Sequence, residues 1–347
     1  MAGTMRGVVF LGDRRAEVRE FPIPAPGPGQ VLVRLRRAAV CGSDLHVYRQ
    51  PSSYFEGKAA WIPGHEPAGD VVALGPGCER VKEGDRVTIY HWLACGHCRE
   101  CRQGYYQFCE QRRGLGQPNA VGPDADYIVV DERNCLLLPA SLSYEDGAFI
   151  ACIAGTGYSA MRKLRCNGED TVLVTGQGPV GLVGDVLAKA MGARVVAVDL
   201  VAERLALADV AGADAIVDAA TEDAGDAVRA LTGGRGATAG YETSGSAAGR
   251  QAVIDGLRVQ GRAAFVGIGA QEPSLPVGPI IGKELTIMGS FVMPIGYYWD
   301  LVAFMLRHDL SSCFDKLVTH RYSLEDAPEA FAIADEGRCG KVMLVWD

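Results

Sequence analysis

The chain has 347 residues, of which 48% are hydrophobic and 22% are charged, and its formal net charge is -8. This length is sufficient for two domains with sizeable cores, and the acidic balance disfavours nucleic acid or an anionic membrane as a partner. The sequence contains no apolar run of about 18 residues, so no membrane span is predicted. The first residues lack the apolar segment of a signal peptide. Because eleven cysteines without such a signal are typical of reduced thiols and bound metal, we expect a cytoplasmic protein.

The first part of the chain is rich in short β-type runs separated by turns. Strands are expected at residues 6–10, 31–40, 70–74, 85–90 and 126–130. Glycine and proline mark turns at PAPGPG (Pro24–Gly29) and GPG (Gly75–Gly77). The pattern predicts a compact, mostly antiparallel β domain over residues 1–152.

After about residue 155 apolar strands alternate with helical stretches. Strands are expected at residues 171–176, 194–199, 215–217, near Tyr241, at 263–269 and at 285–290. Such alternation is typical of a parallel sheet covered by helices on both faces, so we predict an α/β domain over residues 153–291. The remaining residues, 292–347, are expected to return to the first domain and to add a strand at 341–346.

Four cysteines stand close together in the run CGHCRECRQGYYQFC, within a lobe expected at about residues 91–113: Cys95, Cys98, Cys101 and Cys109. The short gaps let one loop place four thiolates around one zinc ion. A set of disulfides is the alternative, but cysteines two residues apart bridge poorly. A four-sulfur site has no open position, so this zinc is predicted to be structural.

A second motif, GQGPVG, follows the apolar strand at 171–176 and opens a helix; its key positions are Gly176, Gly178, Pro179, Val180 and Gly181. In this context the glycines predict a dinucleotide-binding turn that presents a helix N-terminus to a pyrophosphate. Asp199 ends the next strand and is predicted to accept hydrogen bonds from a ribose, which favours NAD over NADP. Its alternative role is a helix cap before Glu203, and Arg204 is either a phosphate ligand or an exposed arginine.

Two further patches carry reactive side chains: Cys41-Gly42-Ser43-Asp44-Leu45-His46, and Gly64-His65-Glu66-Pro67-Ala68-Gly69. Taken singly, each is compatible with core residues, since buried cysteine and hydrogen-bonded histidine are common.

Together with the cysteine lobe and the glycine turn, these patches resemble the zinc-dependent medium-chain alcohol dehydrogenases. The resemblance covers nearly the whole chain and includes GHEPAGDVVALGPGC (Gly64–Cys78), GDRV (Gly84–Val87) and HRYSLEDAPEAF (His320–Phe331). It implies a GroES-like catalytic domain, a Rossmann domain, and a final segment that returns to the catalytic domain. It also implies two zinc ions per chain, NAD as cofactor, and a homodimer or homotetramer.

The resemblance makes Cys41 and His65 ligands of a catalytic zinc, with Cys152 at the place of the third protein ligand. Glu145 is a weaker alternative to Cys152. Glu66 follows His65 directly, and in the family such a glutamate can approach the metal. Asp44 is expected to orient His65 through its other ring nitrogen.

The same resemblance implies that a proton leaves the substrate alcohol through Ser43, then the nicotinamide ribose, then His46, while hydride passes to the nicotinamide. Lys341, in GKVML, is expected either to reach the pyrophosphate or to be exposed. His91 lies four residues before the lobe and is either a substrate-contacting or a structural histidine.

The leading hypothesis is therefore an NAD- and zinc-dependent oxidoreductase whose partner is a small alcohol or ketone, with a secondary alcohol, diol or polyol as substrate. CGSDLHVY (Cys41–Tyr48) is also similar to threonine 3-dehydrogenases, which is the alternative within the same chemistry. A zinc-free quinone reductase is disfavoured because Cys41, His65 and the lobe are present. From another class, a catalytically silent zinc protein with a structural or redox-sensing role remains the competing hypothesis.

Overall fold

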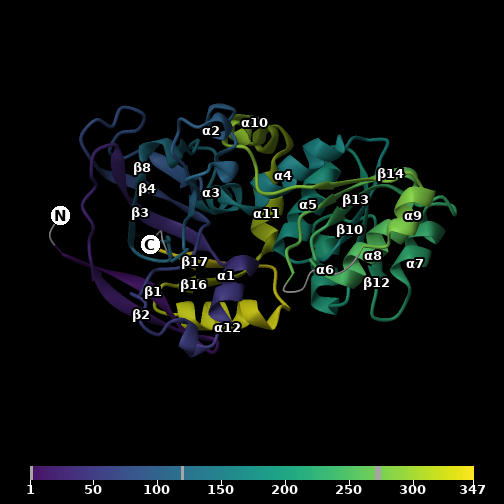
Figure 1. The fold of residues 1–347 in the computed structure, drawn as a ribbon, viewed down its shortest axis with the longest axis horizontal. Coiled ribbons are helices and arrows are strands. Elements are labelled where there is room, and N and C mark those ends of the chain that lie inside the picture. The colour runs from purple at the N-terminus through teal and green to yellow at the C-terminus, as the bar shows by residue number, and fades with distance from the viewer. Residues whose placement is uncertain (1–2, 119–120, 270–274) are drawn as a thin grey trace. The chain divides into compact units, whose positions relative to one another are not determined.

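The computed structural model describes residues 3–118, 121–269 and 275–347, which form two compact units (Figure 1). Unit 1 comprises Met1–Cys152, Pro294–Arg307 and Val318–Asp347. Unit 2 comprises Ile153–Met293 and His308–Leu317. Among the described residues, no helix has both the length and the apolar character that crossing a membrane requires.

The C-terminal boundary differs from the predicted one, since part of the segment 292–347 belongs to unit 2. Helix α11 (Leu310–Leu317) buries Leu310, Phe314 and Leu317. It packs against α5 (Pro179–Ala190) and α6 (Ala202–Val210) of unit 2. Its apolar face therefore completes the core of unit 2, whereas the segments before and after it belong to unit 1.

Unit 1 is built on a sheet in the order β16-β17-β3-β4-β5-β9, in which β8 also pairs with β3. Its pairs are antiparallel except for β16 and β17, which are parallel. The strands of the sheet are β3 (Gln30–Ala39), β4 (Pro67–Leu74), β5 (Arg86–Ile89), β8 (Tyr127–Asp131), β9 (Cys135–Leu137), β16 (Val318–Ser323) and β17 (Lys341–Val345). A hairpin of β1 (Thr4–Gly12) and β2 (Arg15–Pro22), and the short pair β6 (Trp92–Leu93) and β7 (Arg113–Gly114), complete the β structure.

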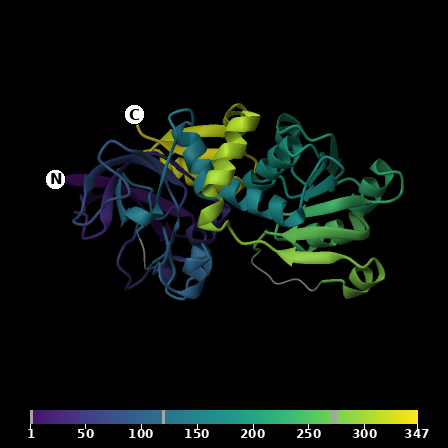
Figure 2. The same ribbon diagram turned by 90° about the horizontal axis from the view of Figure 1, so that it is seen from above.

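Segments that are distant in the sequence meet in unit 1. The last strands of the chain, drawn in yellow in Figure 2, lie together near the C-terminus, and β17 pairs with the early strand β3. The helices of this unit are α1 (Gly42–Tyr48), α2 (Arg99–Arg102), α3 (Tyr144–Ala151), α10 (Tyr298–His308) and α12 (Ala327–Glu336). Because α12 packs on β2, β16 and β17, its buried Phe331 joins Phe10 and Tyr48 in one aromatic cluster of the core.

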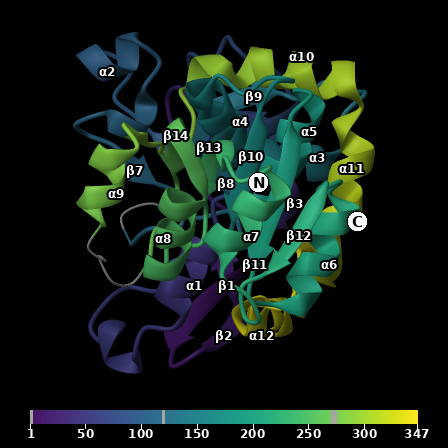
Figure 3. The ribbon, with the colours of Figure 1, turned by 90° about the vertical axis from the view of Figure 1, so that its right-hand side faces the viewer.

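Unit 2 contains a parallel sheet in the order β12-β11-β10-β13-β14-β15, and Figure 3 looks onto most of these strands. They are β10 (Thr171–Thr175), β11 (Arg194–Asp199), β12 (Ala215–Asp218), β13 (Ala237–Glu242), β14 (Leu257–Phe265) and β15 (Thr286–Gly289). The chain builds outward from β10 through β11 to β12 and then restarts on the other side of β10 with β13. Such a reversal of strand order places the ligand crevice of a doubly wound sheet beyond the carboxyl ends of its central strands.

The helices of unit 2 separate into two packed groups, which explains the continuous apolar runs of the strands. Helix α4 (Ile153–Leu164) packs with α5, which also packs with α6 and α11, and α7 (Ala224–Leu231) packs with α8 (Ala247–Gly256). A further short helix, α9 (Val277–Gly282), has no buried residue. Strand residues such as Leu173, Val196 and Ala263 are fully buried between these layers. The predicted α/β fold is thus confirmed, although β14 lies earlier than the expected 263–269.

Candidate active site

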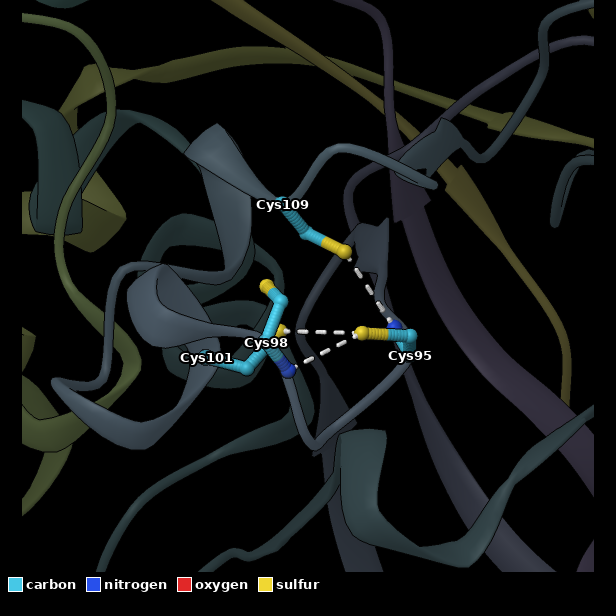
Figure 4. Close-up of side chains that lie close together, drawn as sticks. All are labelled: Cys95, Cys98, Cys101 and Cys109. Carbon is cyan, nitrogen blue, oxygen red and sulfur yellow. Dashed lines mark hydrogen bonds between the residues drawn. The ribbon is translucent and has the colours of Figure 1, made fainter.

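The four lobe cysteines converge on one point, as Figure 4 shows. Their sulfur atoms all lie within 4.8 Å of one another, and Cys95 Sγ and Cys101 Sγ are 3.9 Å apart. Zn–S bonds of about 2.3 Å in a tetrahedron separate the sulfurs by about 3.8 Å, whereas a disulfide would bring them to about 2.05 Å. The spacing therefore fits one tetrahedral zinc ion, and the four cysteines are not bridged to one another.

Backbone N–H groups of the lobe point at its sulfurs. Cys98 N donates to Cys95 Sγ at 3.4 Å, and Cys95 N donates to Cys109 Sγ at 3.3 Å. The backbone N–H groups of His97 and Cys98 lower the pKa of Cys95 to about 6, which favours the thiolate that a metal requires. His97 itself is exposed, and its Nδ1 bonds the carbonyl of Cys95 rather than joining the sulfurs.

A second group of potential metal ligands lies entirely within unit 1. It comprises Cys41, His65, Glu66 and Cys152, whose ligand atoms lie within 4.8 Å of one another. Cys41 immediately precedes α1, His65 and Glu66 precede β4, and Cys152 follows α3. The thiol of Cys152 lowers the pKa of Cys41 well below its usual value, and His65 adds to this effect. The fold thus brings together the three residues expected to hold a catalytic zinc.

Asp44 holds two members of this group in place. Its Oδ1 lies 2.9 Å from His65 Nδ1, and its Oδ2 accepts a hydrogen bond from Cys41 N at 2.9 Å. When Nδ1 carries the proton, the lone pair of Nε2 is available to a metal. Asp44 can occupy this position because it stands in the first turn of α1, three residues after Cys41.

Ser43 and His46 lie on the same short helix at positions i and i+3, so their side chains share one face. Both residues are exposed. Ser43 Oγ is 3.4 Å from His65 Nε2, which puts a hydroxyl beside the potential metal site. The expected proton relay therefore begins next to the cysteine–histidine group and ends at an exposed imidazole.

Glu66 and Lys341 form a buried ion pair that was not foreseen. Lys341 Nζ lies 2.5 Å from Glu66 Oε2 and donates to Val40 O at 2.9 Å. Lys341 is 1% exposed and Glu66 is fully buried. Burial raises the pKa of Glu66, and the charge of Lys341 opposes that rise. The structure corrects both expectations for Lys341. Its ammonium is buried and bonded to Glu66 and Val40 O inside unit 1, so it is neither exposed to solvent nor available to a pyrophosphate.

His91 is buried beside the same group. Its Nδ1 donates to the carbonyl of Ala151 at 2.7 Å, and its ring meets that of His65 edge-on with centroids 5.2 Å apart. Burial lowers the pKa of His91 to about 3, so the ring is neutral and its Nε2 is an acceptor.

The alternative third ligand, Glu145, lies elsewhere. Arg37 Nε and Arg321 Nε donate to its carboxylate at 3.3 and 2.9 Å. These ion pairs lower the pKa of Glu145 against the opposing effect of its partial burial. The carboxylate is therefore neutralised by two guanidinium groups and is absent from the group of potential ligands.

The glycine turn of unit 2 follows β10 and opens α5. Gly176 has a φ of +86°, and Gly178 is the N-cap of α5 with Pro179 at the first helical position and Val180 after it. A Cβ at Gly181 would lie 1.9 Å from Gly176 O, whereas a Cβ at Gly178 would meet nothing within 4 Å. The turn is therefore closed on its inner side and open at Gly178, which leaves space for a pyrophosphate at the helix N-terminus.

Asp199 ends β11 next to this turn. Its Oδ2 accepts from Gln177 N at 2.5 Å, and its Oδ1 accepts from Leu200 N at 2.7 Å and Val201 N at 2.9 Å. It is not the cap of α6, because that position belongs to Val201. Arg204 is partly buried rather than exposed, and its Nε has no hydrogen-bond partner among the described residues.

Sequence reasoning missed Glu242, a fully buried carboxylate at the end of β13. Its Oε1 accepts from Ser244 Oγ at 2.6 Å and from Gly245 N at 2.9 Å. The turn that it shapes is tight against the glycine turn, since a Cβ at Gly176 would lie 2.7 Å from Ser244 N. The sequence signal that could have identified Glu242 is its position as a charged residue at the end of a predicted buried strand, in the run GYETSG.

Comparisons with known proteins agree with this arrangement. Residues 27–140 match the alcohol dehydrogenase GroES-like domain, and residues 179–307 match the zinc-binding dehydrogenase domain. The zinc-type alcohol dehydrogenase-like protein YphC of Escherichia coli is 37% identical over 98% of both chains. L-threonine 3-dehydrogenase of Coxiella burnetii is 32% identical over 95% of this chain and 96% of its own.

Among solved structures, alcohol dehydrogenase TADH from Thermus sp. ATN1 superposes with a TM-score of 0.89. It is 31% identical and is matched over 98% of this chain and 99% of its own. The similarity to these relatives therefore covers nearly the full length of both chains and not only the two matched domains. The chain therefore belongs to the family of zinc-dependent medium-chain alcohol dehydrogenases.

Proposed function

We propose that the protein is an NAD-dependent and zinc-dependent dehydrogenase that interconverts a secondary alcohol, diol or polyol with its ketone. The observation that carries this proposal is the group Cys41, His65 and Cys152, whose ligand atoms lie within 4.8 Å of one another. Two thiolates and one neutral imidazole balance the charge of Zn²⁺, and three protein ligands leave one position for a substrate oxygen. The lobe cysteines would hold a second, structural zinc.

The residues around this group have distinct roles in the proposal. When bound, zinc polarises a substrate oxygen and lowers the pKa of an alcohol. Asp44 keeps His65 oriented, and Ser43 Oγ is the first acceptor for the proton that the substrate hydroxyl loses. The exposed His46 then exchanges that proton with solvent.

The proposed cofactor is NAD rather than NADP. The open helix N-terminus at Gly178 suits a pyrophosphate, and the carboxylate of Asp199 keeps acceptor capacity for ribose hydroxyls beside its three backbone donors. A 2′-phosphate at the same place would be repelled by this charge. NAD, when bound, accepts the hydride from the substrate carbon.

A second candidate substrate is an amino alcohol of the threonine type, because a relative that matches nearly the whole chain is named L-threonine 3-dehydrogenase. Threonine-type members of the family usually carry a carboxylate ligand at the place of Cys152, so the cysteine in this chain favours the first candidate. The non-enzymatic alternative is disfavoured because Cys41, His65, Cys152, Ser43 and His46 are all present in the chain.

The deciding experiment is to follow nicotinamide absorbance while the zinc-loaded protein is offered primary alcohols, secondary alcohols, diols, cyclic polyols and threonine. Turnover with a secondary alcohol or polyol is the expected result. Turnover with threonine alone would select the second candidate. Silence across the panel from a protein that binds both zinc and NAD would contradict the proposed substrate class.

A further inference from the structure

Cys152, the expected third zinc ligand, stands at a break in the helical structure. Helix α3 ends at Ala151 and α4 begins at Ile153, and Cys152 between them has a φ of -141° and a ψ of -75°, outside the helical region. The last C=O groups of a helix have no partner within that helix. Groups from outside α3 are therefore needed to bind these carbonyls and to fix the backbone that carries the Cys152 thiol.

His91 supplies such a group from within unit 1. Its Nδ1 donates to Ala151 O at 2.7 Å, and Nδ1 carries the hydrogen because a carbonyl oxygen can only accept. The N–H of Cys152 makes a longer bond, of 3.4 Å, to Phe149 O. Because Ala151 O and Cys152 N belong to the same peptide group, the short bond from His91 holds the peptide that leads directly into Cys152.

The same ring lies against a second expected ligand. The rings of His91 and His65 meet edge-on with centroids 5.2 Å apart, and the ring of Tyr90 stacks on that of His91 with centroids 5.8 Å apart. His91 is 5% exposed, so little water competes for these contacts. One buried side chain therefore touches both the peptide before Cys152 and the imidazole of His65, although these ligands come from different elements.

The backbone on both sides of His91 is fixed by the buried Asn134. Asn134 Nδ2 donates to Tyr90 O at 2.8 Å and to Trp92 O at 2.9 Å, and Tyr90 N donates to Asn134 O at 2.8 Å. The carbonyl of His91 accepts from Leu115 N at 2.9 Å. The imidazole of His91 thus projects from a backbone that is hydrogen-bonded on either side of it.

We propose that His91 is a positioning residue for the catalytic zinc: its Nδ1–H binds the peptide before Cys152 and keeps the Cys152 thiolate in register with Cys41 and His65. The inference rests on the proposed function, in which Cys152 is a zinc ligand. It assigns His91 no contact with zinc or substrate, and so selects the structural role over a substrate contact. Groups that hold metal ligands in place typically contribute about tenfold to a hundredfold to metal affinity or activity.

The test uses the full chain and three variants. His91→Phe keeps an aromatic ring but removes the donor, whereas His91→Asn removes the ring but keeps an N–H donor near the place of Nδ1. Asn134→Leu keeps the side-chain volume but releases the segment that carries His91. Tyr90→Phe is the matched control, because it removes a buried hydrogen bond of the neighbouring residue, from Tyr90 Oη to Gln107 Oε1 at 3.1 Å, and leaves the bond to Ala151 O in place.

Two of the measurements do not depend on turnover. Zinc affinity is measured by competition with a chromophoric chelator, and the visible absorption bands are recorded with cobalt(II) in place of zinc. The bands that Cys152→Ala abolishes belong to the group of Cys41, His65 and Cys152. The kcat and KM for an alcohol substrate are compared in the same variants.

We expect His91→Phe and Asn134→Leu to bind zinc at this group about tenfold more weakly and to shift its cobalt bands. His91→Asn should stay within about threefold of the wild type in zinc affinity, with unchanged bands, because the hydrogen bond is kept. Tyr90→Phe should unfold more easily but bind both metals as the wild type does. Because His91→Phe and Asn134→Leu change different segments, failure of one to fold leaves the other decisive.

The outcomes separate this inference from the proposed function. Wild-type zinc affinity and cobalt bands in a folded His91→Phe or Asn134→Leu would overturn the positioning role, as would a His91→Asn that is as impaired as His91→Phe. A raised KM in both His91 variants with unaltered metal binding would overturn it in favour of a substrate contact. In these cases the proposed function stands. A wild type in which Cys152→Ala abolishes no cobalt band would overturn the proposed function and the positioning role together.

Discussion

Replacing Lys341 by methionine tests the buried ion pair beside the cysteine–histidine group. Lys341 Nζ is 2.5 Å from Glu66 Oε2, and both side chains are at most 1% exposed. At an effective dielectric constant of about 20, two charges at this separation attract by roughly 6–7 kcal/mol, which offsets the loss of their hydration. Methionine preserves the apolar stem and removes only the charge, so Glu66 and Val40 O lose their donor.

We expect Lys341→Met to lower the free energy of unfolding of the zinc-loaded protein by about 3–5 kcal/mol, which is the usual cost of leaving one charge of a buried pair without its partner. The double variant Lys341→Met with Glu66→Gln should recover most of this loss, because no buried charge remains. Urea unfolding followed by tryptophan fluorescence provides the measurement. Lys189→Met is the control, since its pair with Asp214 is partly exposed and should contribute less than about 1 kcal/mol.

The reasoning would be refuted if Lys341→Met unfolded within about 1 kcal/mol of the wild type, like the control. That result would mean that Glu66 is neutral and needs no partner, because the penalty arises only from an unpaired charge. Failure of the double variant to recover would instead show that Lys341 acts through its bond to Val40 O.

Three further predictions concern the metals, the cofactor and pH. Metal analysis should find two zinc ions per chain, and Cys152→Ala should lose one ion and all turnover; retention of both ions would show that Cys152 is not a ligand. Asp199→Ala should weaken NAD binding about tenfold to a hundredfold and NADP binding much less; an unchanged preference between the two in titrations would remove the proposed ribose contact. Burial raises the pKa of Asp185 in the folded state. The contribution of Asp185 to the free energy of unfolding is therefore fully present below its pKa in the unfolded chain, about 3.9, and is lost as the pH rises toward its pKa in the folded state. Asp185→Asn should therefore match the wild type in stability near pH 4 and exceed it at neutral pH; equal unfolding curves at both pH values would show that Asp185 ionises freely.

Local sequence was sufficient where the chemistry is local. The four lobe cysteines are brought together by one short loop and helix α2, so their spacing alone predicts convergence on a metal. The glycine turn is similar, because the positive φ of Gly176 and the close approach of Gly181 to Gly176 O arise within six consecutive residues. Strand and helix periodicity likewise predicted the parallel sheet of unit 2, whose central strands β10 and β11 carry continuous buried apolar runs.

Tertiary structure decided the features that depend on residues far apart in the chain. Cys152 joins Cys41 and His65 because α3 ends where α1 and β4 meet, and only the resemblance had suggested it. The partner of Lys341 is Glu66, which directly precedes β4 and lies 275 positions earlier in the chain. The state of Asp185 depends on complete burial, which composition does not reveal.

The sequence by itself thus determined the two-part α/β architecture, the cysteine lobe and the dinucleotide turn, since each is encoded by residues that are neighbours in the chain. Only the tertiary structure decided the surroundings of the buried charged groups: Lys341 pairs with Glu66, Glu145 lies between two arginines, and burial raises the pKa of Asp185. The physical reason is that the free energy of a buried charge depends on the groups around it in space, and long-range packing places those groups.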